Sequence, residues 1–421
     1  MKRIRLEKVY ITKSVEADPR ALRRAERLAA GMQAGEVVRG VTDEQLNELV
    51  VQRGWNNVPL WGQIKEEQKK DPDMVLDTFK FHHTPEERKA RYEKYPHLKH
   101  RNLSGYAGFD FRSDGSAEFR RKTHVICQSA WEFHTISGCP FRCGYCWFGG
   151  VNNVKVNIEY FIEHADRRIK ELNPPQTIYK WDNQTDINCF EPEYDATRLM
   201  VDYFAQQKRN FLLLYTGKSD NVDFMLNYDH KGQTIIQWSL AARTQSMEIE
   251  KETAPWDARV EAAAKCEKAG YHVRFRFSPI FPVRNWQQEY KELIELIFAK
   301  THPDVMSLCM FGWMDYERAH SCIDMSLIDE RFVKAMEGTA SFLKGKRYGP
   351  LPHEAREEIY DFLITEIKRV SPDTPIALCL DTREMWTRFQ DRLGMGPDNY
   401  VCVCGPLCTP GNPMLRPHAA M

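Results

Sequence analysis

Three cysteines within eight consecutive residues constrain this chain more than any other feature of its sequence. Cys139, Cys143 and Cys146 have the spacing Cys-x3-Cys-x2-Cys, and the glycine and proline residues around them allow the loop to curl. Three thiolates that converge from one short loop can each bind one iron of a [4Fe–4S] cluster. The fourth iron of such a cluster then has no protein thiolate and is open to another ligand.

A zinc site is the main alternative for this loop. Zinc generally takes four ligands from paired Cys or Cys/His knuckles, and no second knuckle is spaced to match this one. His124 and His134 are available as a fourth ligand, so zinc stays open as an alternative. We favour the iron–sulfur cluster because the three thiols already have the spacing that it needs.

Composition places these thiols in a globular protein. The chain has 421 residues, of which 42% are hydrophobic and 28% are charged, so it has ample material for a packed core. Its twelve cysteines are too few for a disulfide-stapled scaffold, and we expect thiols or metal ligands. The sequence has no run of 18 apolar residues and a charged N-terminus, so we expect a cytoplasmic protein without membrane contact.

Basic residues are concentrated near the N-terminus, although the whole chain has a net charge of zero. Residues 1–128 contain 25 Lys and Arg against 19 Asp and Glu, which leaves +6 there and −6 in the remainder. Aromatic residues such as Tyr92, Tyr106 and Phe111 are interleaved with the basic ones. Such a stretch can bind DNA or RNA through phosphate contacts and stacking. A solvated helical surface is the simpler interpretation, and we favour it.

Residues 129–315 alternate between strand-like and helix-like segments. We expect strands at 177–181, 211–215, 234–239, 272–277 and 305–311. We expect helices at 158–172, with Asn157 as N-cap, and at 193–208, 256–269, 354–370 and 385–393. Strand–helix units of this kind predict an α/β fold, a partial (β/α)6 TIM-like barrel with its chemistry at the C-terminal strand ends. A mostly helical N-terminal region (1–128) and a small Cys-containing C-terminal extension (316–421) would flank it.

The cysteine loop, with Tyr145 before its last cysteine, resembles the radical S-adenosylmethionine (radical SAM) superfamily. Further segments resemble, in the same order, the spore photoproduct lyase family within it: Lys218–Asp223, Gln237–Ser239, Glu250 with Thr253–Ala263, and Lys268–Tyr271 with Ser278–Ile280. The resemblance covers roughly residues 135–295 and implies that the open iron chelates SAM. One electron, from a reductant such as flavodoxin or ferredoxin, would then cleave SAM to a 5′-deoxyadenosyl radical, which abstracts a hydrogen atom.

The resemblance also implies which residues bind SAM. The family's SAM-binding lysine and serine match Lys218 and Ser239, Tyr145 belongs to the same site, and a polar residue between Asp182 and Thr185 assists. A zwitterionic ligand at strand ends needs a cation for its carboxylate and hydroxyl or amide donors. Without the resemblance, Lys218 would be interpreted as a surface lysine and Ser239 as a strand-end cap.

One position departs from the family pattern. Spore photoproduct lyases return a hydrogen atom to the product radical from a cysteine, and that position falls on Asn183 here. A tyrosine that assists the relay is replaced by Trp147. Cys189, six residues after Asn183, could act as donor only if its loop folds back. Because an amide or an indole is a poor hydrogen-atom donor, we expect an activity other than thymine-dimer repair.

A second group of cysteines lies near the C-terminus. Cys402, Cys404 and Cys408 have the spacing Cys-x-Cys-x3-Cys, and Cys379 ends the last predicted strand. Four thiols brought together in this way could hold a second Fe–S cluster or a zinc ion. Bound metal would also order a tail that is rich in glycine and proline. The alternative is a set of buried free thiols.

Two classes of function follow from the sequence. The first is a radical SAM enzyme acting on a nucleic-acid base, a modified thymine or a nucleotide, with the base flipped into the mouth of the barrel. Within this class, a small-molecule or peptide substrate and spore photoproduct repair are the alternatives. The second class is a non-catalytic Fe–S or zinc protein that binds nucleic acid. Tyr145, Lys218 and Ser239 favour the enzyme.

Overall fold

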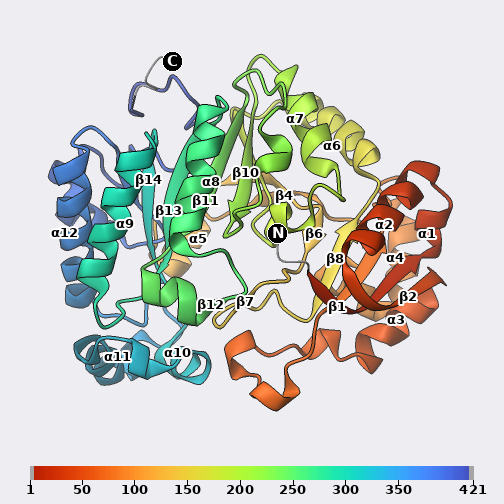
Figure 1. Ribbon diagram of the computed structural model, residues 1–421, viewed down its shortest axis with the longest axis horizontal. Coiled ribbons are helices and arrows are strands. Elements are labelled where there is room, and N and C mark those ends of the chain that lie inside the picture. Colours follow the sequence, from red (N-terminus) through yellow and green to blue (C-terminus); the bar gives the residue numbers. More distant parts are fainter. Residues whose placement is uncertain (1–3, 417–421) are drawn as a thin grey trace.

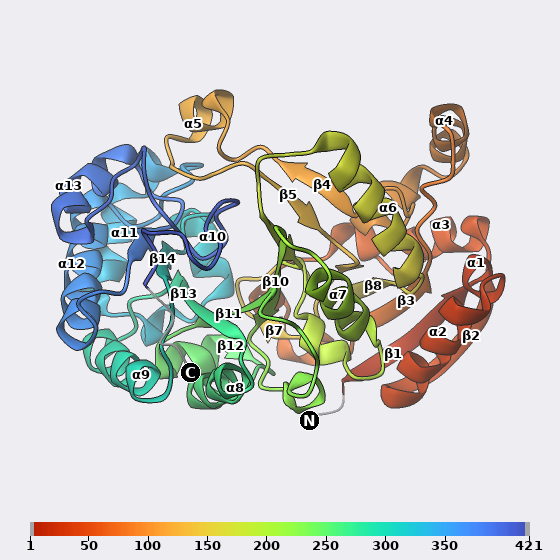
Figure 2. The ribbon, with the colours of Figure 1, turned by 90° about the horizontal axis from the view of Figure 1, so that it is seen from above.

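Two β-sheets lie next to each other, with helices packed around both (Figures 1 and 2). The structure is a computed structural model that describes residues 4–416. The helices are α1 (Lys13–Glu16), α2 (Pro19–Gly31), α3 (Asp43–Gln52), α4 (Pro85–Lys94), α5 (Ala117–Thr123), α6 (Ile158–Leu172), α7 (Ala196–Ala205), α8 (Trp256–Lys268), α9 (Trp286–Lys300), α10 (Tyr316–Cys322), α11 (Glu330–Leu343), α12 (His353–Val370) and α13 (Arg383–Leu393). No helix in this described part is both long and apolar enough to cross a membrane.

The larger sheet contains eight strands and carries the candidate site. In spatial order they are β15 (Ile376–Leu378), β14 (Met306–Met310), β13 (His272–Ile280), β11 (Thr234–Leu240), β10 (Phe211–Gly217), β9 (Ile178–Trp181), β5 (Ala130–Phe133) and β4 (Phe109–Arg112). All neighbours except β4 and β5 are parallel. Central strands are apolar on both faces, as in β10, where Leu212, Leu213 and Leu214 are fully buried.

The α/β class is confirmed by this arrangement. The sheet is open, because the edge strands β15 and β4 do not pair with each other within residues 4–416. The partial (β/α)6 barrel stays a prediction. Helices α6, α7, α8 and α9 each connect successive parallel strands, which places the C-terminal strand ends at one edge of the sheet.

The N-terminal region differs from the mostly helical prediction because it builds a second sheet. Its order is β2 (Gln33–Val41), β1 (Arg5–Thr12), β3 (Asp73–Asp77), β8 (Val151–Lys155) and β6 (Ile136–Ser137). Strand β2 is largely exposed, and glycine and charged residues interrupt its valines, so its sequence lacks the apolar run of a buried strand. Strands β8 and β6 join this sheet from beyond residue 128, whereas β4 joins the larger one. The predicted boundary at 128 therefore does not separate the two sheets.

Most predicted elements of the larger sheet occur within a few residues of their expected bounds. Helix α6 has the predicted bounds and Asn157 occupies its N-cap position as predicted, but the Asn157 side chain makes no capping hydrogen bond. The Asn157 side chain accepts a hydrogen bond from the Phe79 backbone N–H at 2.8 Å and donates one to the Phe79 carbonyl at 3.2 Å. It therefore joins α6 to the segment after β3 instead of capping its own helix.

Candidate active site

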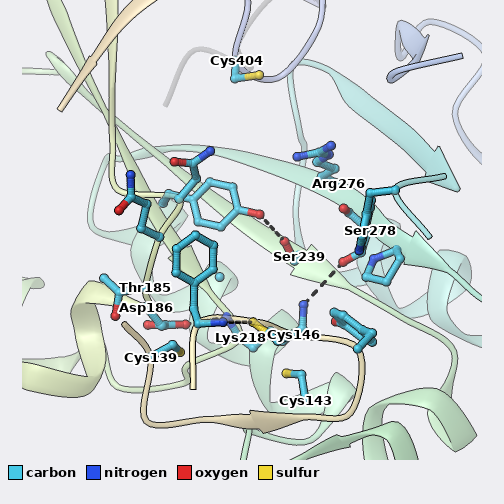
Figure 3. Close-up of a pocket in the computed structure, with 18 of the residues that line it drawn as sticks. Cys139, Cys143, Cys146, Thr185, Asp186, Lys218, Ser239, Arg276, Ser278 and Cys404 are labelled. Atoms are coloured by element: carbon cyan, nitrogen blue, oxygen red, sulfur yellow. Dashed lines mark hydrogen bonds between the residues drawn. The ribbon is translucent and has the colours of Figure 1, made fainter. Parts of the chain in front are cut away.

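One cavity of about 320 Å³ collects the cysteine loop and most of the residues predicted to bind SAM. It lies at the C-terminal ends of the central parallel strands, where catalytic residues of parallel α/β folds gather. Figure 3 shows the three loop cysteines on one side of this pocket and Cys404 on the opposite side. Lys218 after β10, Ser239 at the end of β11 and Ser278 on β13 lie between them.

The cysteine loop is held by backbone contacts on both sides. Its short strand β7 (Arg142–Cys143) pairs with β12 (Glu250–Lys251), and Gly144 N–H donates to the Ile249 carbonyl at 2.8 Å. Gly138 precedes the loop with φ +118°, and a Cβ there would lie 2.1 Å from the Val151 carbonyl oxygen. Only glycine fits this position, so the loop's entry is fixed by the backbone.

The three loop cysteines suit an iron–sulfur cluster better than a single metal ion. Burial raises the pKa of each thiol, that of Cys143 to about 12, so bound iron would be needed to stabilise the thiolates. Within residues 4–416 no three Cys, His, Asp or Glu side chains are gathered tightly enough to hold one ion. His134, considered as a zinc ligand, instead contacts Asp182 through Nδ1 at 2.8 Å. Neither His134 nor His124 lines the cavity.

A buried group of charges positions Lys218 beside the loop. Glu250 accepts hydrogen bonds from Tyr145 Oη and Arg259 Nη1, both at 2.9 Å, and lies 3.6 Å from Lys218 Nζ. Burial alone would lower the pKa of Lys218, but Glu250 and Cys143 outweigh it and keep that pKa above its ordinary value. Lys218 therefore stays protonated in the pocket. Glu250 belongs to a segment that resembles the family, but sequence reasoning did not place it in the site.

At the end of β9, Thr185 faces the pocket and Asp182 does not. The Thr185 hydroxyl lines the cavity and is buried without a hydrogen-bond partner. Asp182 was predicted to bind SAM, but its carboxylate accepts backbone N–H groups of Thr135 at 3.0 Å and Gln184 at 3.0 Å, besides contacting His134. It is used to shape the loop and is absent from the cavity wall, so this assignment is not supported by its position.

Asp186 was missed by sequence reasoning and lines the cavity instead. Its carboxylate accepts the backbone N–H groups of Lys218 at 2.5 Å and Ser219 at 2.9 Å. Burial raises the pKa of Asp186 to about 7, against the effect of these hydrogen bonds. The carboxylate thereby fixes the turn that presents Lys218. No sequence motif indicates this role, because it depends on the ends of β9 and β10 lying side by side.

Two residues that were not predicted to belong to the site lie beside Ser239 in the pocket. The Ser239 hydroxyl lies 2.9 Å from the Tyr215 hydroxyl, and Arg276 is the direct neighbour of Ser239 on β13. All three line the cavity. Alternation along the strands placed Ser239 at a strand end, but only the strand register brings Tyr215 and Arg276 beside it.

The residues considered where the chain departs from the family pattern line two different cavities. Asn183 and Trp147 line the main cavity, and the Trp147 ring also stacks on Arg318 at 4.4 Å. Cys189 lies in a one-turn helix behind Asp186 and lines a separate cavity with Phe141. The loop thus does not fold back to bring Cys189 to the main cavity wall, so its position does not support a role as donor.

The C-terminal cysteines come to the same pocket from two directions. Cys379 and Cys404 line the cavity, while Cys402 and Cys408 lie behind Cys404. Hydrogen bonds from the body of the protein also hold this tail. Arg274 forms a pair with Asp304 at 2.7 Å and donates to the carbonyls of Val403 at 3.0 Å and Cys408 at 2.6 Å.

Several residues of the basic, aromatic N-terminal stretch form ion pairs or hydrogen bonds within the protein. Arg91 is buried and pairs with Asp43 at 2.6 Å, and Arg101 donates to the carbonyl of Gly149 at 3.0 Å, just after the cysteine loop. The remaining exposed cations include those of α5, which projects from the body in Figure 2. Phe111 is 53% exposed, so an exposed aromatic and exposed cations occur in this stretch.

Comparison with known proteins identifies one family. A family model described as spore photoproduct lyase matches residues 128–377, which is more than half of the chain. The spore photoproduct lyase of Bacillus subtilis (strain 168) is 30% identical over 175 residues, covering 40% of this chain and 51% of the relative. That of Clostridium acetobutylicum is 25% identical over 166 residues, covering 38% and 49%. The matches thus span about half the length of these curated relatives.

Solved structures of the same family share the fold over most of the chain. A single-site mutant of spore photoproduct lyase has a TM-score of 0.61 at 17% identity and covers 88% of this chain and 98% of its own. A spore photoproduct lyase complexed with dinucleoside spore photoproduct has a TM-score of 0.59 at 18% identity, covering 89% and 99%.

Proposed function

We propose that this chain, which belongs to the spore photoproduct lyase family, is a radical SAM enzyme. Bound at the loop cysteines, a [4Fe–4S] cluster would bind SAM and, once reduced by a protein such as flavodoxin or ferredoxin, supply a 5′-deoxyadenosyl radical. The observation that carries the proposal is the pocket itself. It places Cys139, Cys143 and Cys146 beside a protonated Lys218 and a free Thr185 hydroxyl.

The residues of the pocket have distinct roles in this proposal. Lys218 neutralises the carboxylate of SAM, and Thr185 supplies a hydroxyl that has no hydrogen-bond partner within residues 4–416. Glu250 keeps Lys218 charged and, through Tyr145, ties its position to the cysteine loop. Ser239 and Tyr215 offer hydroxyl groups to the nucleoside part of SAM.

The substrate that we propose is a thymine-type base in DNA or a modified nucleotide. One solved relative is described with bound S-adenosylmethionine and dinucleoside spore photoproduct, and this chain shares its fold. The exposed cations and Phe111 of the N-terminal stretch would serve phosphate contacts and stacking. Asn183 lines the pocket where a thiol donor is expected, so we propose hydrogen abstraction without the repair reaction's final transfer.

Deuterium transfer tests this proposal. The reconstituted protein is incubated anaerobically with SAM, dithionite and either an oligonucleotide deuterated at the thymine methyl groups or dinucleoside spore photoproduct. We expect deuterium in the 5′-deoxyadenosine formed with the oligonucleotide, and little conversion of the spore photoproduct to two thymines. Efficient conversion would identify a repair lyase instead. If 5′-deoxyadenosine forms without deuterium from the oligonucleotide and the spore photoproduct is not converted, the nucleic-acid substrate is contradicted while SAM cleavage stands.

A further inference from the structure

Six of the twelve cysteines gather on the side of the pocket that faces the cysteine loop. Cys127, Cys379 and Cys404 line the cavity, and Figure 3 shows Cys404 across from the loop. The other three lie just behind them: Cys309 next to Cys379, and Cys402 and Cys408 next to Cys404. They come from four separate segments: before β5, at the end of β14, just after β15, and in the tail.

Three of these thiols share one wall of the cavity. Cys127, Cys379 and Cys404 line it together with Arg112 and Arg276. Cys402 lies beside this wall, because its Sγ and that of Cys408 would lie 3.2 Å and 2.4 Å from a Cβ placed on Gly405, the residue after Cys404. The Tyr400 hydroxyl next to them is buried and has no hydrogen-bond partner within residues 4–416.

The surroundings of these thiols contain more cations than anions. Arg276 Nη2 donates to Cys309 Sγ at 3.0 Å and to Cys379 Sγ at 3.1 Å, and its Nε is buried without a partner. Within residues 4–416, no carboxylate lies within ion-pair distance of Arg276. Arg112 donates to Cys127 Sγ at 3.0 Å but already pairs with Glu132 at 2.5 Å. Arg276 is therefore the buried cation that lacks a compensating anion, which neutral thiols cannot supply.

We propose that Cys127, Cys379, Cys402 and Cys404 bind a second iron–sulfur cluster in the wall of the pocket. Four thiolates around a four-iron core give a net charge of roughly −2, which Arg276 and Arg112 would compensate through their hydrogen bonds to sulfur. Such hydrogen bonds also set the reduction potential of a cluster. The proposal assigns an electron-carrying group to the side of the pocket that faces the SAM loop, and it does not depend on SAM cleavage.

The arrangement favours a cluster over a single zinc ion. One zinc ion needs four sulfurs in direct tetrahedral contact, and the described residues contain no such group. The same is true of Cys139, Cys143 and Cys146, as expected when each thiol binds a different iron. Order in the tail does not require metal, because Arg274 already holds it. Ordering of the tail therefore does not explain why the thiols converge at the cavity, whereas binding of a cluster does.

Iron and sulfide counting in a variant that lacks the first site tests the proposal. The full chain with Cys139→Ala, Cys143→Ala and Cys146→Ala is reconstituted anaerobically with ferrous iron and sulfide. We expect about four irons and four sulfides per chain, against about eight of each in the wild type. Adding Cys379→Ala and Cys404→Ala should reduce the iron count at least fivefold. The matched control adds Cys266→Ala, a buried thiol of α8, and should retain the iron.

Two results would overturn the second cluster. One is a folded triple variant, judged by circular dichroism, that retains no sulfide; the other is one zinc per chain without sulfide. If the triple variant does not fold, the wild-type count decides, since about eight irons support the proposal and about four contradict it. An electron paramagnetic resonance signal from the dithionite-reduced triple variant provides a second readout. Loss of SAM cleavage in the wild type would leave these counts unchanged, so the two proposals fail separately.

Discussion

The two cysteine-bearing walls of the pocket are built in opposite ways. The SAM-loop wall, Cys139–Cys146, is one short segment whose backbone is fixed by β12 and by Gly138. The thiol wall, which comprises Cys127, Cys379, Cys402 and Cys404, is assembled from three distant segments. A site built from one short segment can be recognised in the sequence from the spacing of its residues. A site built from distant segments can be recognised only when the positions of the strands and the tail are known.

The two walls also differ in how their charges are balanced. Beside the SAM loop, the cations Lys218 and Arg259 share the buried carboxylate of Glu250. In the thiol wall, Arg112 pairs with Glu132, whereas Arg276 donates to sulfur and has no carboxylate partner within residues 4–416. The first wall thus balances its cations with a carboxylate, whereas the second holds one unbalanced cation, whose charge the proposed cluster would compensate.

The largest effect should come from the SAM loop. Cys143→Ala removes one of three iron ligands, and we expect 5′-deoxyadenosine formation to fall by at least about 1,000-fold, since the cluster supplies the electron. Quantification of 5′-deoxyadenosine by mass spectrometry checks this. Cys266→Ala is the matched control and should stay within about twofold. Activity in Cys143→Ala near that of the control would disprove the assignment of the loop.

Breaking the balanced charges should cost stability. Glu250→Gln leaves Lys218 and Arg259 buried without their carboxylate, and we expect a loss of about 3–5 kcal/mol in the free energy of unfolding. Urea denaturation of the protein measures the change. Glu248→Gln, at an exposed position two residues away, should change it by less than about 0.5 kcal/mol. Equal stability of the two variants would contradict the role given to Glu250.

The corresponding change beside the thiol wall should act on the tail. Arg274→Met removes the pair with Asp304 and two hydrogen bonds to tail carbonyls. We expect a loss of about 3 kcal/mol and rapid proteolysis between residues 400 and 416. Limited proteolysis followed by mass spectrometry locates the cuts. A tail that remains resistant would show that something other than Arg274 holds it.

The smallest effect should come from Cys189. Because it lines a separate cavity, Cys189→Ala should leave the rate of 5′-deoxyadenosine formation within about twofold, with a stability loss near 1 kcal/mol from the lost buried sulfur. The same assay measures the rate, and thermal denaturation the stability. A tenfold lower rate in a stably folded variant would place Cys189 in the reaction after all.

What could be predicted from the sequence follows from how local each feature is. The strands and helices of the larger sheet have regular apolar periodicity, and the loop cysteines, Lys218 and Ser239 have motif context, so these were expected where they are. Strand β2 is exposed and has no continuous apolar run, so its sequence did not indicate the N-terminal sheet. Asp182 and Asp186 are close in sequence and both accept backbone N–H groups, but only Asp186 lines the pocket. Only strand register separates such neighbours.

The central claim is that the cysteine loop and Lys218 form a SAM-cleaving site. The most direct measurement is 5′-deoxyadenosine formed per chain after anaerobic reconstitution with iron and sulfide, then addition of SAM and dithionite. We predict more than one equivalent from the wild type and at least tenfold less from Lys218→Ala at equal iron content. A wild-type protein that holds its iron but forms no 5′-deoxyadenosine with dithionite, flavodoxin or ferredoxin would contradict the claim.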